Sequence, residues 1–325
     1  MNRHPILFAL LALLLYTTAC RKNSQNCGLE CSLQEEMLFQ TNFEGTLITN
    51  EGNSARLSGT DLSLDSLSDW AALEAHPNIG SVNIYYEDGD LTQRFADITT
   101  DPENPNNKVL HFKISEPHID AGGGKEKGRV QLNLSDNQCI KEYYQTVKLY
   151  LHPDMAYLKQ WQEEITWLSL FEFWNNANWT GEKHPFRVTV NLVKTETGVT
   201  DDLYFQVKGD HQSPFGKWQD DWRVTAEDFS VPFGQWMELE LYIREGNADN
   251  GRFYLSVTPE GGPKTVLFDL TNNTQHSKEK CPDGFSHFHP LKLYTSDRLI
   301  KFMNDNGKNL DIYWDAWKVY LNREP

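Results

Sequence analysis

The residues best suited to chemistry in this sequence are polar side chains that alternate with apolar ones in several short segments. Such alternation places the polar set of a strand on one face and the apolar set on the other. The polar sets are mainly Arg, Gln, Asn, Thr, Tyr and Lys, which can hydrogen-bond the hydroxyl and carboxylate groups of a sugar. They include Arg129, Gln131 and Asn133, then Arg187, Thr189 and Asn191, and then Lys292 and Tyr294. An ordinary solvated sheet face shows the same pattern, so both interpretations are open.

The alternating segments also predict the fold class. They run from 129 to 321 and are separated by turn clusters rich in Gly, Pro, Asn and Asp. Many short strands without alternating long helices predict an all-β, antiparallel β-sandwich of jelly-roll type with a polar concave sheet. We expect one domain over 37–325, with short helices only over 65–75 and 153–164.

The first twenty residues predict export. A short charged head, an apolar run over 6–16 and small residues before Cys20 are typical of a secretory signal. The ending resembles the lipobox of bacterial lipoproteins, with Thr17 where that family usually has Leu, and this resemblance implies lipidation of Cys20. We therefore expect a signal over 1–19, a polar tether over 20–36 and a chain anchored in the cell envelope, on the periplasmic side or the outer-membrane surface. A secreted protein with an incidental Cys20 is the alternative.

Four further cysteines can form disulfides, because an exported chain reaches an oxidising compartment. Three pairings are possible among Cys27, Cys31, Cys139 and Cys281. We favour Cys27 with Cys31 and Cys139 with Cys281, since the first two share the tether. Zinc binding is the alternative, but no His lies near Cys27 or Cys31 at ligand spacing.

Composition limits the partners. The formal net charge is −16, which argues against nucleic acid or an anionic membrane surface as a ligand. The chain contains 10 Trp, 13 Tyr and 17 Phe, and flat glycan-binding faces use such rings. A monomer that binds a polysaccharide or oligosaccharide, with membrane contact only through the lipid, is the simplest expectation.

A family resemblance sharpens this expectation. The order of several segments resembles that of the jelly-roll, concanavalin-like polysaccharide lyases, a group with alginate, glucuronan and heparin lyases. The segments are Gly128–Leu132, Tyr144–Pro153, Trp167–Trp174, Pro185–Val188, Pro232–Trp236, Gly251–Phe253, Pro290–Tyr294 and Asp311–Asp315. The resemblance spans about 128–321 and rests on strand order and a few anchor residues.

The resemblance implies a reaction and a site. In the family an Arg-bearing strand, a strand with a Gln or His pair and a late strand with Lys and Tyr line the concave sheet. By matching segment, these positions are Arg129 and Gln131, then Glu172 and Trp174, then Lys292 and Tyr294. The implied chemistry is β-elimination from a uronate, with Arg129 and Gln131 neutralising the carboxylate and Tyr294 acting as base or acid.

The second of these strands departs from the family. Glu172 stands where several relatives have Gln and His, and a carboxylate there would repel a uronate. His184, His287 or His289 could supply a base from loops. A non-catalytic carbohydrate-binding protein is therefore an open alternative. The substrate-binding candidates are Glu172, Trp174, Asn175, Trp179 and Arg187, with Trp218 and Trp222 as a further aromatic rim.

Two more alternatives concern carboxylates. A retaining glycoside hydrolase needs two carboxylates about 5 Å apart, and Glu238 with Glu240, or Asp311 with Asp315, alternate correctly without the usual spacing of that class. Jelly-roll carbohydrate modules commonly hold a structural Ca²⁺ where their first and last strands pair. Glu44 and Asp315 are the side chains expected there, although capping of a turn and solvation explain them equally well.

Overall fold

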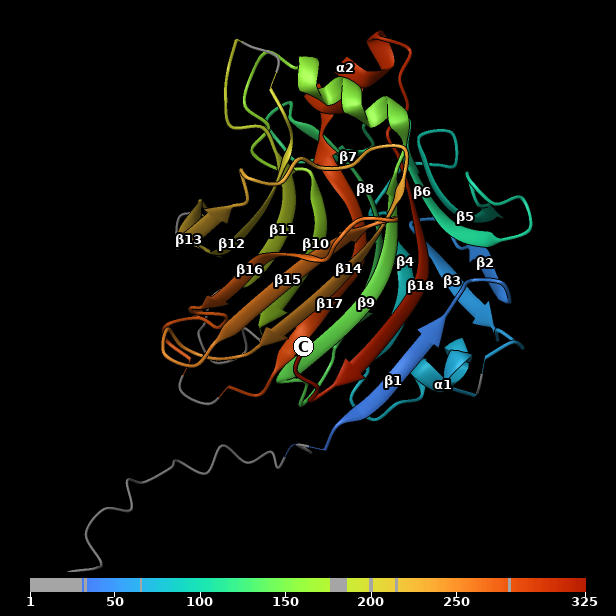
Figure 1. The fold of residues 1–325 in the computed structure, drawn as a ribbon, viewed down its shortest axis with the longest axis vertical. Coiled ribbons are helices and arrows are strands. Elements are labelled where there is room, and N and C mark those ends of the chain that lie inside the picture. Colours follow the sequence, from blue (N-terminus) through green and yellow to red (C-terminus); the bar gives the residue numbers. More distant parts are fainter. Residues whose placement is uncertain are drawn as a thin grey trace, which may run out of the picture.

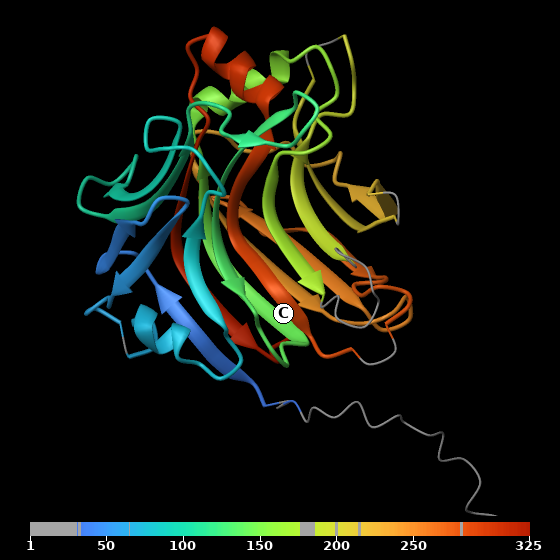
Figure 2. The same ribbon diagram turned by 180° about the vertical axis from the view of Figure 1, so that it is seen from behind.

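The computed structural model describes residues 31, 34–64, 66–175, 186–198, 201–213, 216–279 and 282–325. Two antiparallel sheets pack face to face, which confirms the β-sandwich predicted from the alternation. Figure 1 looks onto the first sheet and Figure 2 onto the second.

The first sheet has eight strands, in the order β16-β15-β14-β9-β18-β6-β5, with β1 also paired to β18. Their bounds are β1 Glu36–Thr41, β5 Arg94–Thr100, β6 Lys108–Ile114, β9 Glu142–Leu151, β14 Trp236–Arg244, β15 Arg252–Pro259, β16 Thr265–Thr271 and β18 Asp311–Leu321. The first and last strands therefore pair, as expected, and Glu44 lies just after β1.

The second sheet has ten strands, in the order β13-β12-β11-β10-β17-β8-β4-β3-β2, with β7 paired to β8. Their bounds are β2 Thr46–Asn50, β3 Ser54–Gly59, β4 Ser81–Tyr85, β7 Ile119–Asp120, β8 Glu126–Ser135, β10 Ser169–Asn175, β11 Arg187–Val193, β12 Tyr204–Gln212, β13 Trp218–Thr225 and β17 Phe285–Ser296.

The apolar side chains of each alternating strand form one core between the sheets. Val130, Leu132 and Leu134 of β8 are completely buried, and so are Leu291 and Leu293 of the neighbouring strand β17. Because successive side chains of a strand point to opposite faces, this packing turns the intervening polar residues outward. The core therefore decides which side chains reach the outer face of the second sheet.

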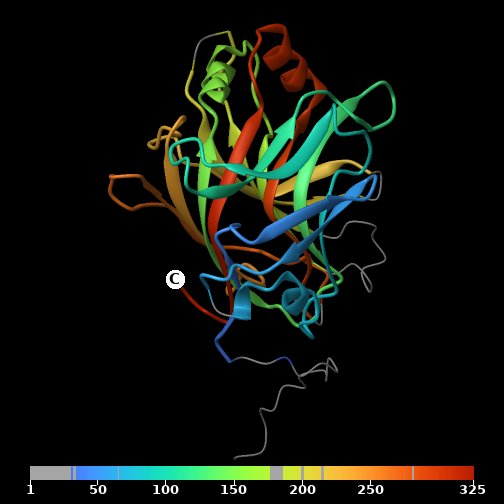
Figure 3. The same ribbon diagram turned by 90° about the vertical axis from the view of Figure 1, so that its right-hand side faces the viewer.

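Helices are few and short. The segment expected to be helical over 65–75 contains the 3-10 turn η1 (Ser66–Ser68) and α1 (Trp70–Glu74), which is capped by Asp69. The second forms the 3-10 helix η2 (Pro153–Gln160). A helix that was not predicted from the sequence, α2 (Asp297–Asp305), lies beside η2 at one end of the sandwich in Figures 1, 2 and 3. In the described part of the chain, no helix has the length and apolar character needed to cross a membrane.

The disulfide differs from the expected pairing. Cys31 bonds to Cys139, so the expected bonds Cys27–Cys31 and Cys139–Cys281 are both wrong. Strand pairing explains the difference, because Glu36 at the start of β1 lies opposite Leu321 of β18, which in turn lies opposite Tyr143 of β9. This register brings the segment before β1 to the connection that precedes β9. Cys27 and Cys281 lie outside the described residues.

Candidate active site

A polar cleft of about 1050 Å³ lies on the face of the second sheet that turns away from the core. Many of the residues singled out in the sequence line it, from strands far apart along the chain. They are Arg129, Gln131, Glu172, Trp174, Asn175, Arg187 and Tyr294. The cleft lies at the upper end of the usual range of ligand pockets and so offers room for an oligosaccharide.

Arg129 and Tyr294 lie opposite each other on β8 and β17. The guanidinium carbon of Arg129 is 4.6 Å from the centre of the Tyr294 ring, and the ammonium of Lys292 is 4.8 Å from it. Lys127 is a third cation near this ring, at 5.7 Å. Arg129 also forms an ion pair with Glu87, which lines the same cleft. This end of the cleft therefore concentrates positive charge around one phenol.

Glu172 is the centre of a buried charge cluster beneath the cleft. Its carboxylate accepts hydrogen bonds from the ammonium of Lys292 and, at 2.8 Å each, from Nδ1 of His289 and the guanidinium of Arg187. Burial opposes ionisation of Glu172, but Lys292, His289 and Arg187 outweigh it and hold the pKa of this carboxyl well below its usual range. Glu172 was expected to repel a uronate. The structure corrects this expectation, because Lys292 and Arg187 compensate the charge of Glu172.

Lys292 itself does not reach the cleft surface. Only 1% of this residue is exposed, and its ammonium is directed at Glu172. Burial lowers the pKa of Lys292 to about 7, against the opposing effect of Glu172. A lysine enclosed in this way can set the charge of its neighbours but does not contact a ligand in the cleft.

His289 is held as a neutral imidazole. Burial, together with the positive charge of Lys292, lowers the pKa of His289 to about 3, although Glu172 acts in the opposite direction. Since the carboxylate of Glu172 accepts from Nδ1, the proton of the neutral ring is assigned to Nδ1. Nε2 then carries a lone pair, and the ring lines the cleft. A neutral ring with a lone pair on Nε2 can accept a proton, which is the first requirement of a general base.

A bulge in β17 brings His289 to the cleft. His289 and Tyr294 are five positions apart, so a regular strand would place them on opposite faces. The register between β17 and β8 shifts between Phe288 and Leu291, where Pro290 lies. The shift turns His287 and His289 to the same face as Tyr294. Proline inside a central strand is the sequence signal that could have located this bulge, because it cannot donate to the ladder.

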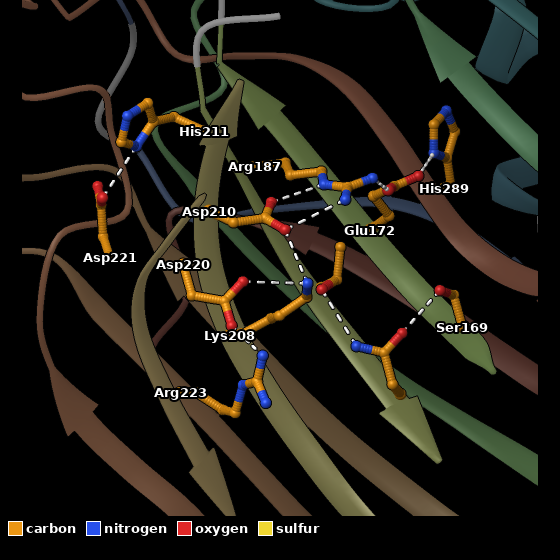
Figure 4. Close-up of polar contacts among 12 residues, drawn as sticks. Ser169, Glu172, Arg187, Lys208, Asp210, His211, Asp220, Asp221, Arg223 and His289 are labelled. Atoms are coloured by element: carbon orange, nitrogen blue, oxygen red, sulfur yellow. Dashed lines mark hydrogen bonds and ion pairs between the residues drawn. The ribbon is translucent and has the colours of Figure 1, made fainter. Parts of the chain in front are cut away.

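Aromatic side chains form the other end of the cleft. Trp174 and Trp218 have ring centres 5.6 Å apart, and Trp218 is 37% exposed. The guanidinium carbon of Arg187 lies 3.6 Å from the Trp218 ring and 5.3 Å from that of Trp174. Asp210 binds this guanidinium through two hydrogen bonds, of 2.7 and 3.1 Å. Figure 4 shows Arg187 between Asp210 and Glu172, with His289 beyond Glu172.

Trp222 does not join this aromatic end. Its indole N–H donates to the carbonyl of Asn273 at 2.7 Å, and its ring packs against the core. The ring lies against Gly209, where an added Cβ would meet Nε1 of Trp222 at 2.3 Å. A register shift between Gly209 and Asp210 separates the two tryptophans, so of this pair only Trp218 lines the cleft.

The remaining candidates lie elsewhere or outside the described residues. Asn175 is buried at the cleft wall and donates to Glu245 at 3.0 Å. Trp179 and His184 fall outside the described part. The alternating pairs expected for a glycoside hydrolase, Glu238 with Glu240 and Asp311 with Asp315, belong to β14 and β18 of the first sheet and do not line the cleft.

The proposed calcium ligands already have protein partners. Glu44 accepts from the backbone N–H of Lys108 at 2.9 Å, and Asp315 accepts from the side-chain amide of Asn107 at 3.1 Å. No group of three or more His, Cys, Asp and Glu side chains in the described ranges is arranged to hold a metal ion. Calcium binding at Glu44 and Asp315 stays an untested prediction.

Comparisons with known proteins give distant likenesses. No model of a known protein family matches the sequence, and no curated protein matches it. An endo-β-1,4-glucuronan lyase from the fungus Trichoderma reesei is similar in structure, with 12% identity, a TM-score of 0.42, and coverage of 75% of this chain and 91% of that chain. A marine alginate lyase from Aplysia kurodai has 9% identity and a TM-score of 0.42, with coverage of 68% and 86%.

A β-glucanase catalytic domain from Podospora anserina is also similar, with 11% identity, a TM-score of 0.39, and coverage of 87% of this chain and 95% of that chain. The three neighbours thus include both lyases and a glucanase. At these identities the likenesses do not assign a reaction, so the chemistry of this chain has to be argued from the side chains of its own cleft.

Proposed function

We propose that the protein is a polysaccharide lyase that cleaves a uronate-containing glycan by β-elimination in this cleft. The observation that carries the proposal is the neutral His289, oriented by Glu172 at 2.8 Å, in one cleft with Arg129 and Tyr294. Elimination needs a group that neutralises the uronate carboxylate, a base for the C5 proton and an acid for the leaving oxygen. These three residues supply one group of each kind.

The proposed step begins with the guanidinium of Arg129 on the uronate carboxylate. Withdrawal of the negative charge makes the C5 proton more acidic, and Nε2 of His289 removes it. The electron pair of the C5–H bond forms the C4–C5 double bond while the C4–O bond breaks. Tyr294 then donates its phenolic proton to the departing oxygen. The products are a new reducing end and an unsaturated uronate, with no water consumed.

Gln131 completes the recognition of the sugar in this proposal. One N–H of its side-chain amide donates to Asn133 at 2.6 Å, which leaves a second N–H for the substrate carboxylate. Within the described residues, its buried Oε1 atom has no hydrogen-bond partner. A buried acceptor without a partner is costly, so a ligand that draws the Gln131 side chain toward the cleft could relieve this cost. Gln131 therefore supports both charge neutralisation and hydroxyl recognition.

A two-channel assay tests the proposal. The purified protein is incubated with alginate, glucuronan, heparin and pectin, and both ultraviolet absorbance and new reducing ends are followed. Elimination produces unsaturated uronate and reducing ends in equal number, whereas hydrolysis produces reducing ends alone. Reducing ends without the absorbance would argue for a hydrolase, and neither signal on any uronate glycan would reject catalysis on these substrates.

Glycan capture without turnover is the second candidate function. The exposed Trp218 offers a stacking surface whether or not chemistry follows. Isothermal titration with the same glycans separates the two functions, because capture predicts binding with no product of either kind.

We also propose that export and lipidation of Cys20 place the domain at the cell envelope as a monomer. The support is the sequence before Cys20. Metabolic labelling with a clickable fatty acid tests it, since Cys20→Ser should abolish labelling and release the protein from membranes. An unchanged label in the variant would contradict lipidation at this residue. Sedimentation of the mature domain checks the oligomeric state.

A further inference from the structure

The charges that line the cleft cancel. Among the described lining residues, three cations stand against three carboxylates, namely Lys127, Arg129 and Arg187 against Glu87, Asp136 and Glu172. Behind this lining, the positive charge of Lys292 and the negative charge of Asp210 also cancel in the sum. A chain with a uronate at every position brings one negative charge per sugar ring. The described residues of the lining hold no matching excess of positive charge.

Among the described residues, cations gather at one end of the cleft. Lys127, Arg129 and Lys292 surround the ring of Tyr294 within 5.7 Å. At the aromatic end, Arg187 is held by both Asp210 and Glu172 and is stacked on Trp218, so its charge is compensated within the protein. A neutral ring suits that end, because an aromatic face stacks on the apolar face of a sugar.

Glu87 adds a fixed negative charge beside Arg129. Its backbone lies in the left-handed region, with a φ of 79°. Residues with a side chain adopt this conformation at a cost in energy. The buried guanidinium of Arg94 holds the following turn through the carbonyls of Asp88 and Gly89, at 2.9 and 2.6 Å. A carboxylate maintained at this position repels a second uronate at the neighbouring position along the glycan.

We infer that the cleft selects heteropolysaccharides in which each uronate is flanked by neutral sugars, and discriminates against homopolyuronates. The inference rests on the proposed function for its single uronate position at Tyr294. The other sugar positions are inferred from the charge pattern of the cleft. One carboxylate is accepted at the cationic end, and neutral rings are accepted toward Trp174 and Trp218. Glu87 and Asp136 are then specificity-determining carboxylates.

The test compares glycans of different charge density. Hyaluronan and gellan, in which glucuronate is separated by neutral sugars, are set against alginate and polygalacturonate, in which every ring is charged. Binding is measured by titration calorimetry with the Tyr294→Phe protein, and kcat/KM with the native protein. We expect the separated-uronate glycans to bind at least about tenfold more tightly, which is about 1.4 kcal/mol.

Charge variants make the test independent of sugar linkage. The Glu87→Gln/Asp136→Asn double variant should strengthen binding of alginate and polygalacturonate roughly tenfold, and that gain should shrink as salt screens the charges. Glu238→Gln removes the same kind of charge from an exposed position on the first sheet and should leave binding unchanged.

The outcomes separate the two proposals. Homopolyuronates that bind the native cleft as well as the separated-uronate glycans, or a double variant without effect, would overturn the inference. The expected binding preference without any unsaturated product would support the inference and reject only the lyase step. Absence of binding to every glycan would reject both.

Discussion

Glu172 and His289 face each other across β10 and β17, with Oε2 of the carboxylate 2.8 Å from Nδ1 of the imidazole. The carboxylate fixes the Nδ1–H tautomer, and the surrounding burial keeps the ring neutral. Lys292 and Arg187 in turn compensate the carboxylate. One buried cluster therefore determines the state of the proposed base.

The low pKa of His289 predicts how stability changes with pH. The folded protein holds this ring neutral down to about pH 3, whereas in the unfolded chain it is protonated below about pH 6.5. The unfolded state then binds more protons between these values, so stability falls as pH decreases through this window. In urea titrations across this range, His289→Gln should give a shallower loss of stability with acid. An unchanged slope would contradict a buried neutral His289.

Replacement of Tyr294 by Phe should separate binding from turnover. The substitution removes only the hydroxyl that is proposed to protonate the leaving oxygen, and the ring still packs near Trp167, whose centre is 4.7 Å away. Product formation should fall by roughly 10²–10⁴-fold, the usual contribution of acid–base catalysis. Glycan affinity, measured by calorimetry, should change little. Retained turnover would assign the proton transfer to another group.

Truncation of Arg129 should weaken uronate binding. The lost hydrogen bond to a charged group is worth about 1.5–3 kcal/mol, and removal of the guanidinium also leaves Glu87 near the substrate carboxylate. Calorimetry on Arg129→Ala measures the effect. Arg223→Ala is the control, because this exposed arginine of β13 pairs with Asp220 and does not line the cleft. Equal losses in both variants would indicate a general effect of charge.

Removal of Lys292 should destabilise the fold. Lys292→Met leaves the buried Glu172 without its principal cation, and breaking a buried ion pair costs about 3–5 kcal/mol. Adding Glu172→Gln should recover part of this loss, because no uncompensated charge then remains, and urea unfolding of the single and double variants measures the coupling. Lys301→Met, which breaks an exposed pair with Asp297, should have little effect. Additive losses at Lys292 and Glu172 would contradict the pairing.

Where strand pairing is regular, the sequence predicts which side chains lie on each face of the sheet. Arg129 lies opposite Tyr294 and Gln131 opposite Lys292, and the buried Val130 and Leu132 fix this parity. A period of two is enough to place side chains on such a segment. For this reason the alternation could place Arg129, Gln131 and Tyr294 on one face of the second sheet.

The proposed base could not be located in the same way. His289 reaches the cleft only because the register shifts around Pro290, and counting positions from Tyr294 places it on the wrong face. The partners of Glu172 are likewise contributed by other strands, with His289 and Lys292 on β17 and Arg187 on β11. These ion pairs join residues of different strands. The alternation of residues within one strand therefore does not reveal them.

The central claim is elimination, and the mass balance of the products tests it most directly. A defined uronate oligosaccharide that the protein cleaves is digested, and the products are weighed by mass spectrometry. Elimination predicts pairs of products whose masses sum to that of the substrate, one of them carrying a C4–C5 double bond, and no such pairs with His289→Gln. Products that have gained a water molecule, or full activity of His289→Gln, would contradict it.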